Sequence, residues 1–103
     1  MHLTSQELAL VREILKQQVP EYGVIAFGSR VHGRNLKKFS DLDLAIQTRT
    51  PLPTEKLVSV KNAFSESDLP FKVDVIDWAE TAEKFRKIIK TASAVIQPAP
   101  QKT

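Results

Sequence analysis

The fold is decided by one stretch of the chain, FGSRVHG at residues 27–33 followed by SDLDL at residues 40–44. This stretch joins a glycine-serine turn to two carboxylates that are one residue apart. Because successive side chains of a strand point to opposite faces, Asp41 and Asp43 project together while the leucines beside them face the other way. Paired carboxylates attract a divalent cation. The pattern therefore predicts a metal site next to a phosphate-binding turn.

A third carboxylate follows in FKVDVID at residues 71–77, where Asp74 stands near the middle of an apolar, strand-like run. A buried charge without a partner is unfavourable, so such an aspartate normally pairs, binds metal or takes up a proton. If this strand lies beside that of Asp41 and Asp43, the three carboxylates converge until Mg2+ neutralises them. Asp77 ends the run on the opposite face, so we expect it to cap the next helix.

Hydrophobic periodicity and turn residues predict the elements around these motifs. They are a helix from a Thr4 capping box up to Pro20, a strand at 22–27, a short helix through Val31, a strand at 41–47, a helix at 54–67 capped by Thr54, a strand at 71–76, and a final helix, capped by residues from Asp77 onward or by Thr81, with Phe85, Ile88, Ile89 and Ala92 on one side.

Strands that are joined by helical crossovers favour a small mixed sheet covered by helices, an α/β (α+β) fold. The 103 residues can bury a modest core but leave little room for a second domain. We therefore expect one domain over residues 1–96. The proline-rich residues 97–103 are expected to form an unstructured tail.

Composition favours a soluble cytoplasmic protein. The chain has no cysteine, no long apolar span and no signal-peptide pattern, so neither disulfides nor a membrane segment are expected. Its net charge of +3 is small and the basic residues are spread among the helices. Direct nucleic-acid binding is therefore not expected.

One local concentration of positive charge, Arg30, Arg34, Lys37 and Lys38, lies in the spacer between the turn and the paired aspartates. A nucleoside triphosphate would explain this placement, with Arg30 and Lys37 as phosphate contacts; the alternative is a solvated loop with ordinary surface charges. Gly33 either relaxes the backbone behind the turn or lets phosphate approach closely.

Each residue of the pattern also has a plain structural explanation when it is taken alone. Gly28 fits a tight turn and Ser29 a helix cap. Asp41 fits the cap of a turn and Asp43 a solvated strand face. Their joint order favours the metal-site interpretation over these alternatives.

The order of glycine-serine turn, spacer, Asp-x-Asp strand and later strand aspartate resembles the nucleotidyltransferase superfamily of the DNA polymerase beta type. The chain over residues 22–90 is most similar to the minimal nucleotidyltransferases, the MNT-domain antitoxins that are encoded beside a helical HEPN-domain partner. The residues that match the superfamily pattern are Gly28, Ser29, Asp41, Asp43 and Asp74.

The resemblance implies transfer of AMP from ATP, in some members to a tyrosine of the paired HEPN toxin, with two Mg2+ ions. It implies that Asp41 and Asp43 bridge the metals and that Asp74 binds the metal nearest the acceptor hydroxyl. Ser29, with the amides after Gly28, would hold the beta and gamma phosphates.

Two other functions stay open. One is a non-catalytic antitoxin subunit that binds nucleotide or masks its helical partner. The other is an antibiotic nucleotidyltransferase, but these normally carry additional chain that holds the small-molecule acceptor.

Overall fold

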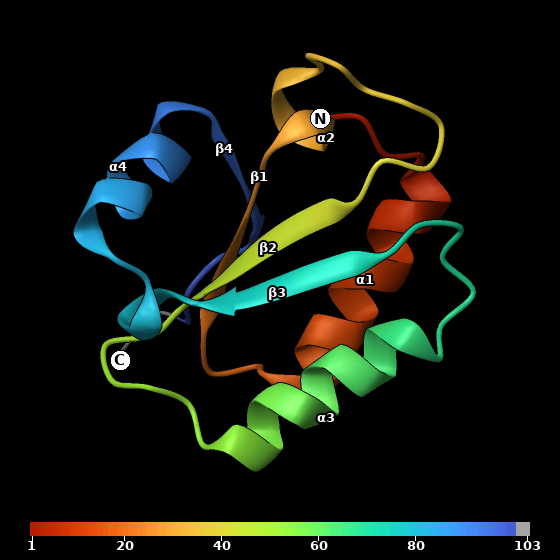
Figure 1. Cartoon of the computed structure of the whole chain (residues 1–103). Coiled ribbons are helices and arrows are strands. Elements are labelled where there is room, and N and C mark those ends of the chain that lie inside the picture. The colour runs from red at the N-terminus through yellow and green to blue at the C-terminus, as the bar shows by residue number, and fades with distance from the viewer. Residues whose placement is uncertain (101–103) are drawn as a thin grey trace.

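The structure is a computed structural model that describes residues 1–100. Within these residues the strands form one mixed sheet in the order β3-β2-β1-β4 (Figure 1). β1 runs antiparallel to β2 and β4, whereas β2 and β3 are parallel. This sheet, covered by helices, confirms the predicted fold class. The strands are β1 (Gly23–Phe27), β2 (Leu42–Gln47), β3 (Val73–Asp77) and β4 (Ser93–Gln97).

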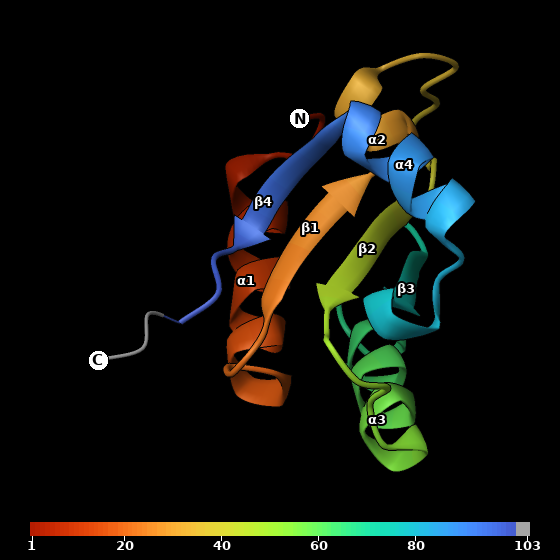
Figure 2. The same ribbon diagram turned by 90° about the vertical axis from the view of Figure 1, so that its left-hand side faces the viewer.

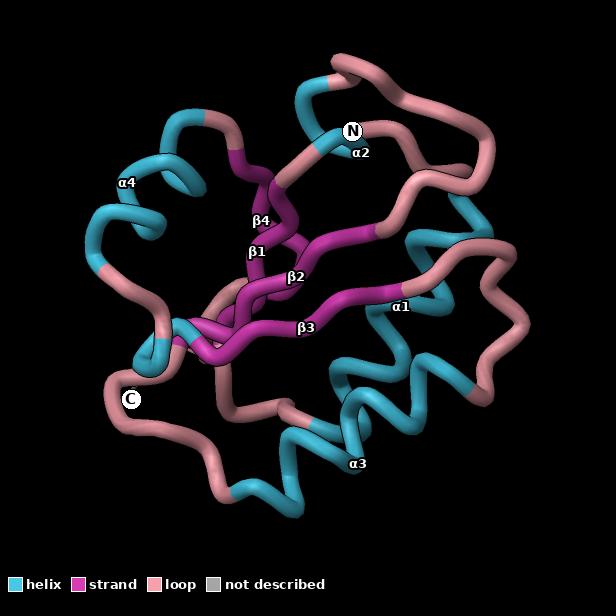
Figure 3. The backbone as a smooth tube through the Cα atoms, viewed as in Figure 1, coloured by secondary structure: helices cyan, strands magenta, loops and turns pink. Residues whose placement is uncertain are grey.

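The two faces of the sheet are covered by different helices. Figure 1 shows α1 and α3 on one side of the sheet and α4 on the other. α2 follows β1 at the upper end of the sheet, and the long loop between α2 and β2 is visible in Figure 3. The helices are α1 (Ser5–Gln18), α2 (Ser29–His32), α3 (Thr54–Ser65) and α4 (Glu83–Thr91), with a 3-10 helix η1 (Trp78–Glu80) before α4.

The main core lies between the sheet and the α1/α3 layer. Leu15 of α1 and Phe64 of α3 pack with Leu44 of β2 in one buried cluster. Burial of such a side chain contributes about 1.5–3 kcal/mol. A smaller cluster on the opposite face joins Ile89 of α4 to Ala45. Because side chains alternate along β2, Asp43, which lies between Leu42 and Leu44, faces the opposite side of the sheet, which α4 covers.

Local sequence explains how α1 begins and ends. The amide of Glu7 donates to Thr4 Oγ1 at 3.0 Å, and Thr4 N donates to the Glu7 carboxylate at 2.9 Å. This is the predicted capping box. The helix ends at Gln18, ahead of Pro20, and a buried stripe that includes Val11 faces the sheet.

The caps predicted for α3 and for the final helix are wrong, whereas the capping role of Asp77 is confirmed. Pro53 occupies the N-cap position of α3, and Thr54 is already the first helical residue. Asp77 does act as a cap, but for η1, because its carboxylate accepts from Ala79 N at 3.2 Å. α4 begins only at Glu83, after Ala82, which has no side-chain cap bond.

The last strand, β4, was not among the predicted elements. It pairs with β1, with a register shift between Val24 and Ile25. Gln97 ends β4, and its side-chain amide donates to the carbonyls of Val19 and Tyr22 at 2.9 and 2.8 Å. The expected start of a tail at Gln97 is therefore wrong. Residues 98–100 carry no helix or strand (Figure 2), and the rest of the predicted tail, 101–103, lies outside the described residues.

Over residues 1–100, none of the helices combines the length and apolar character needed to cross a bilayer.

Candidate active site

Asp43 lies at the centre of the predicted constellation. It is the second residue of β2, and its Cα partners are Phe27 on the antiparallel strand β1 and Asp74 on the parallel strand β3. Residues paired in this way project to the same face of a sheet. The two carboxylates therefore lie side by side on the α4-covered face, although Asp74 comes 31 positions later in the sequence.

The charges around Asp43 change its protonation. Its pKa is raised from 3.8 to about 6, mainly because burial disfavours the charged form, and further because the carboxylates of Asp74 and Asp41 repel it. Asp41 is exposed and stands directly before β2. The charges of the other two predicted carboxylates thus act on Asp43.

The glycine-serine turn packs against the same carboxylate. Gly28 has a φ of +81°, and a Cβ placed on it would collide with Oδ2 of Asp43. Only a residue without a side chain fits at this point, both because of the left-handed φ and because of the contact. The predicted phosphate-binding turn and the predicted metal ligand are therefore in direct contact.

Ser29 and Gly33 mark the two ends of α2. Ser29 is its first residue, and its carbonyl accepts from Gly33 N at 2.8 Å. Gly33 is the C-cap, with a left-handed φ of +76°. A Cβ there would lie 2.7 Å from Nε2 of His2. This placement favours the backbone role over close phosphate approach for Gly33.

The position of the Arg30 side chain argues against its predicted contact with phosphate. Its side chain is only 6% exposed. The guanidinium donates to the carbonyl of Ser40 at 2.7 Å and lies 4.0 Å from the ring centroid of Phe71. It also donates to the carbonyls of His2 at 2.9 Å and Lys38 at 3.0 Å. Arg30 therefore anchors the loop that leads into Asp41.

Lys37 lies within that loop, and its side chain is exposed. Its amide donates to Ser40 Oγ at 2.9 Å, and its carbonyl accepts from Ser40 N at 3.1 Å. The backbone of Lys37 thus forms the tight turn that precedes Asp41. A phosphate contact of its side chain stays a prediction.

Two cavities flank the carboxylates. One, of about 830 Å³, is lined by Asp43 and Asp74 together with Phe27 and Phe85. The second, of about 250 Å³, lies between α4 and the turn at Gly28. Phe27 and Phe85 line both cavities, and their rings meet edge to face with centroids 6.0 Å apart.

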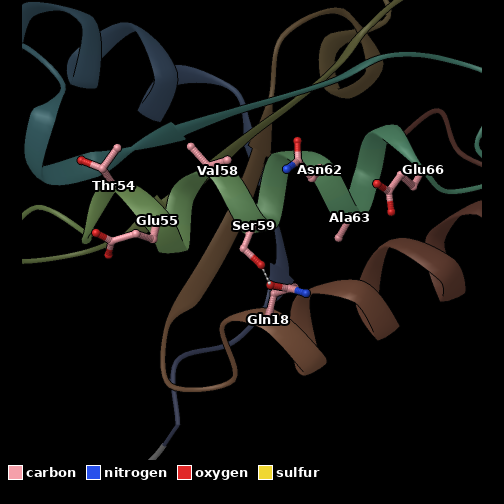
Figure 4. Close-up of a pocket in the computed structure, with 8 residues that line it drawn as sticks. All are labelled: Gln18, Thr54, Glu55, Val58, Ser59, Asn62, Ala63 and Glu66. Atoms are coloured by element: carbon pink, nitrogen blue, oxygen red, sulfur yellow. Dashed lines mark hydrogen bonds between the residues drawn. The ribbon is translucent and has the colours of Figure 1, made fainter.

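A further groove, of about 610 Å³, lies between the end of α1 and α3 (Figure 4). There Ser59 donates a hydrogen bond of 2.8 Å to the side-chain oxygen of Gln18. None of the predicted site residues lines this groove. It shares one lining residue, Asn62, with the cavity that contains the carboxylates.

The donor set fits a hard divalent cation, because all three predicted ligands are carboxylates and they repel one another at Asp43. The three are not assembled in advance: within residues 1–100, no group of three or more acidic or histidine side chains is close enough to hold a metal ion. Asp74 instead faces Lys72, whose Nζ lies 3.6 Å from Oδ1. A bound ion would have to draw these side chains together.

Two aromatic residues of the site were not predicted as site residues. Phe27 is the last residue of β1 and pairs with Asp43, and Phe85 comes from α4. The sequence holds one signal for Phe27, since it directly precedes the glycine-serine turn. Phe85 could be found only once the position of α4 was known.

A turn that packs against paired strand carboxylates, on a mixed sheet of this kind, is the arrangement that the resemblance to the nucleotidyltransferases implies. The chain matches the family model of the nucleotidyltransferase domain over residues 8–97 and belongs to that family. The enzyme class and the predicted resemblance to minimal nucleotidyltransferases are thereby confirmed.

The chain is 55% identical to the probable protein adenylyltransferase MntA of Haemophilus influenzae (strain ATCC 51907 / DSM 11121 / KW20 / Rd). The similarity extends over 97 residues, which are 94% of this chain and 84% of that protein. The fold is also similar to a solved toxin-antitoxin crystal structure with AMP-PNP. The TM-score is 0.73 at 19% identity, over 91% of this chain and 74% of that one.

Proposed function

We propose that this chain moves AMP from ATP to an acceptor on another protein in a Mg2+-dependent reaction. The observation that carries the proposal is the contact of Gly28 with Asp43, which in turn pairs with Asp74 across parallel strands. This contact brings a phosphate-type turn against the carboxylates on which nucleotidyl transfer depends. The 55% identical relative, a probable protein adenylyltransferase, supports the same reaction.

In the proposed reaction the acceptor oxygen attacks the alpha phosphorus of ATP, and pyrophosphate leaves. Asp41 and Asp43 would hold the metal ions, which supply positive charge to the attacking and leaving oxygens when bound. Asp74 is 44% exposed beside Asp43, so its carboxylate is available to help remove the hydroxyl proton. Ser29 would hold the terminal phosphates, and the chain supplies mainly positioning and electrostatics.

The acceptor is proposed to be a tyrosine of a HEPN-type toxin, which makes this chain the antitoxin of a cytoplasmic pair. A structure with the same fold comes from a toxin-antitoxin complex, which is consistent with such a partner. The single tyrosine of the chain, Tyr22, directly precedes β1, whereas the site is built where β1 ends. An acceptor tyrosine therefore has to come from another molecule.

A non-catalytic antitoxin is the second candidate function. Lys72 already places its ammonium group 3.6 Å from the carboxylate of Asp74. Among the described residues, the three carboxylates are not close enough together to hold a metal ion. A chain that only masked its partner would keep full affinity after loss of these carboxylates.

The test is incubation of the purified chain with alpha-labelled ATP and Mg2+, with and without the HEPN-type product of the adjacent gene. Intact mass of both proteins is the readout. We expect one or more AMP additions on the partner, lost in Asp41→Asn and Asp43→Asn. Asp68→Asn, at an exposed residue outside the site, is the matched control and should transfer normally. Complex formation with no mass gain would support the masking subunit instead.

A further inference from the structure

Two large apolar side chains of α4 are exposed beside the candidate site. Phe85 is 43% and Ile88 60% exposed. The helix is already fixed to the sheet by Ile89, which is 2% exposed and packs on Ala45. The fold thus leaves Phe85 and Ile88 partly exposed. Exposed apolar groups with polar neighbours are typical of interaction sites.

This apolar pair is continuous with the carboxylate site. Ile88 and Phe85 form one wall of the 250 Å³ cavity, and Gly28 belongs to the opposite wall. Phe85 also lines the cavity that contains Asp43 and Asp74. A molecule that covered Ile88 would therefore lie beside Phe85, the side chain of α4 that lines both cavities.

The charges of α4 are divided between two sides. The guanidinium of Arg86 turns inward and donates to the carbonyl of Trp78 at 3.0 and 2.6 Å. Lys90 lies over the ring of Trp78. Lys84 and Lys87 are exposed, and neither forms an ion pair within residues 1–100. The outer side of α4 therefore carries an apolar pair and two lysines that form no ion pair over the described residues, with Glu83 one helical turn before Lys87.

We propose that this face of α4, defined by Lys84, Phe85, Lys87 and Ile88, is the docking surface for the acceptor protein. The occupant is an acidic segment of that protein, with an apolar side chain seated against Ile88. Charge complementarity argues for the acidic character, and the apolar centre argues for a protein rather than a nucleic acid. The inference rests on the proposed function only in naming the docked protein as the acceptor.

Docking here would present an acceptor to the carboxylates. The docked segment would sit at the cavity wall that Phe85 forms, and its hydroxyl would face Asp74 in the same cavity. Docking and nucleotide binding would use different walls of the same site. Changes on the outside of α4 should therefore affect the acceptor and leave ATP binding intact.

The experiment measures the affinity of the full chain for the purified HEPN-type partner by calorimetry, in parallel with its affinity for ATP. Ile88→Asp and the double variant Lys84→Glu/Lys87→Glu should each weaken partner binding by about tenfold or more. Affinity for ATP should stay within about twofold of that of the unmodified chain. In the unmodified chain, partner affinity should fall with added salt, and less steeply in the double variant.

Matched controls lie away from α4, on α1, on α3 and in the loop after β2. Val58→Asp changes a residue of α3 that is 48% exposed, and Lys16→Glu/Arg49→Glu makes the same charge change away from α4. Both should bind the partner normally. Normal binding by the α4 variants, no partner binding by the unmodified chain, or loss of binding only for Val58→Asp would each overturn the proposal.

Two further outcomes separate this inference from the proposed function. If the α4 variants lose affinity and the unmodified complex transfers no AMP, the docking surface stands and the transferase reaction fails. If the double lysine variant loses affinity for a single-stranded RNA but keeps its affinity for the partner, the surface is a nucleic-acid site and the proposal is overturned.

Discussion

Gly28 and Asp43 are in contact so close that any side chain at the first would displace the carboxylate of the second. Gly28 directly follows β1, and Asp43 is the second residue of β2, so the contact is made across the antiparallel pair. It fixes the distance between the turn and the carboxylates. The turn and the carboxylates therefore behave as one structural unit.

Gly28→Ala tests this unit. A residue with a Cβ at φ +81° is strained, and the methyl group must push Asp43 aside. We expect the free energy of unfolding to fall by about 1–3 kcal/mol and AMP transfer to be lost even below the unfolding temperature. Urea denaturation and the mass assay measure the two effects.

Gly33→Asn is the matched comparison. Asparagine tolerates the left-handed φ of +76°, and the neighbouring atom belongs to the His2 side chain rather than to backbone. Transfer should therefore persist. Complete loss of transfer in a folded Gly33→Asn variant would restore the interpretation of Gly33 as a phosphate contact.

The raised pKa of Asp43 predicts a pH-dependent stability in the absence of metal. Its folded pKa of about 6 lies above its ordinary value, so the stabilisation is complete at low pH and is lost as pH rises through about 6. Asp43→Asn has no such charge and should be more stable than the unmodified chain at pH 7. The difference should vanish below about pH 4.

Thermal unfolding of both proteins in a chelating buffer, from pH 4 to pH 8, measures this difference. Asp68→Asn, with its exposed carboxyl, should follow the unmodified chain throughout. An Asp43→Asn variant that is less stable at pH 7 would contradict the raised pKa that burial and the neighbouring carboxylates give Asp43.

Arg30→Lys separates anchoring from phosphate binding. A lysine cannot reach three carbonyls in a fixed fork or stack flat on Phe71. We expect the free energy of unfolding to drop by about 2–3 kcal/mol. Lys37→Ala, in the exposed loop, should change it by less than about 0.5 kcal/mol.

Equilibrium denaturation and ATP titration are measured for both variants. Unchanged stability in Arg30→Lys together with a large loss of ATP affinity would show that Arg30 contacts phosphate after all.

Asp74 and Asp77 should respond in opposite ways to substitution. The buried carboxylate of Asp77 accepts from Leu52 N at 2.7 Å, from Ala79 N and from the hydroxyl of Thr48. Asp77→Ala removes the acceptor of Leu52 N and of the Thr48 hydroxyl, whereas Ala79 N keeps its bond to Thr48 Oγ1. The substitution should lower stability by about 1–3 kcal/mol while the folded fraction still transfers AMP. Asp74→Asn should abolish transfer at unchanged stability.

Mass assays normalised to the folded fraction, measured by circular dichroism, test this pair. A folded but inactive Asp77→Ala variant would show that the third catalytic carboxylate is Asp77 and not Asp74.

Strand periodicity was sufficient to predict that Asp43 and Asp74 lie on the same face of the sheet. Asp43 alternates with buried leucines, and Asp74 stands in an apolar run, so both side chains were expected on one face if their strands were neighbours. A helical crossover between them favoured that neighbourhood, because it suits parallel pairing. The structure confirms the sheet and the Asp43–Asp74 pairing that follows from it.

The parts that sequence could not predict depend on contacts between distant residues. Arg30 looked like a solvent-exposed cation because its partners are backbone carbonyls, including that of His2, which carry no sequence signal. β4 is short and becomes a strand only because β1 offers a free edge. Asp41 lies outside β2, so alternation along the strand does not determine its side-chain position.

The stacking of Arg30 on Phe71 makes the order of synthesis matter. Arg30 and the loop before Asp41 emerge from the ribosome well ahead of Phe71, so during that interval the guanidinium has its carbonyl partners but not the ring that covers it. β3 begins two residues after Phe71 and brings Asp74. A nascent or truncated chain that stops before Phe71 therefore has an incomplete site and an uncovered Arg30. Competence would arise late, when the segment that carries the last carboxylate also completes the packing around Arg30.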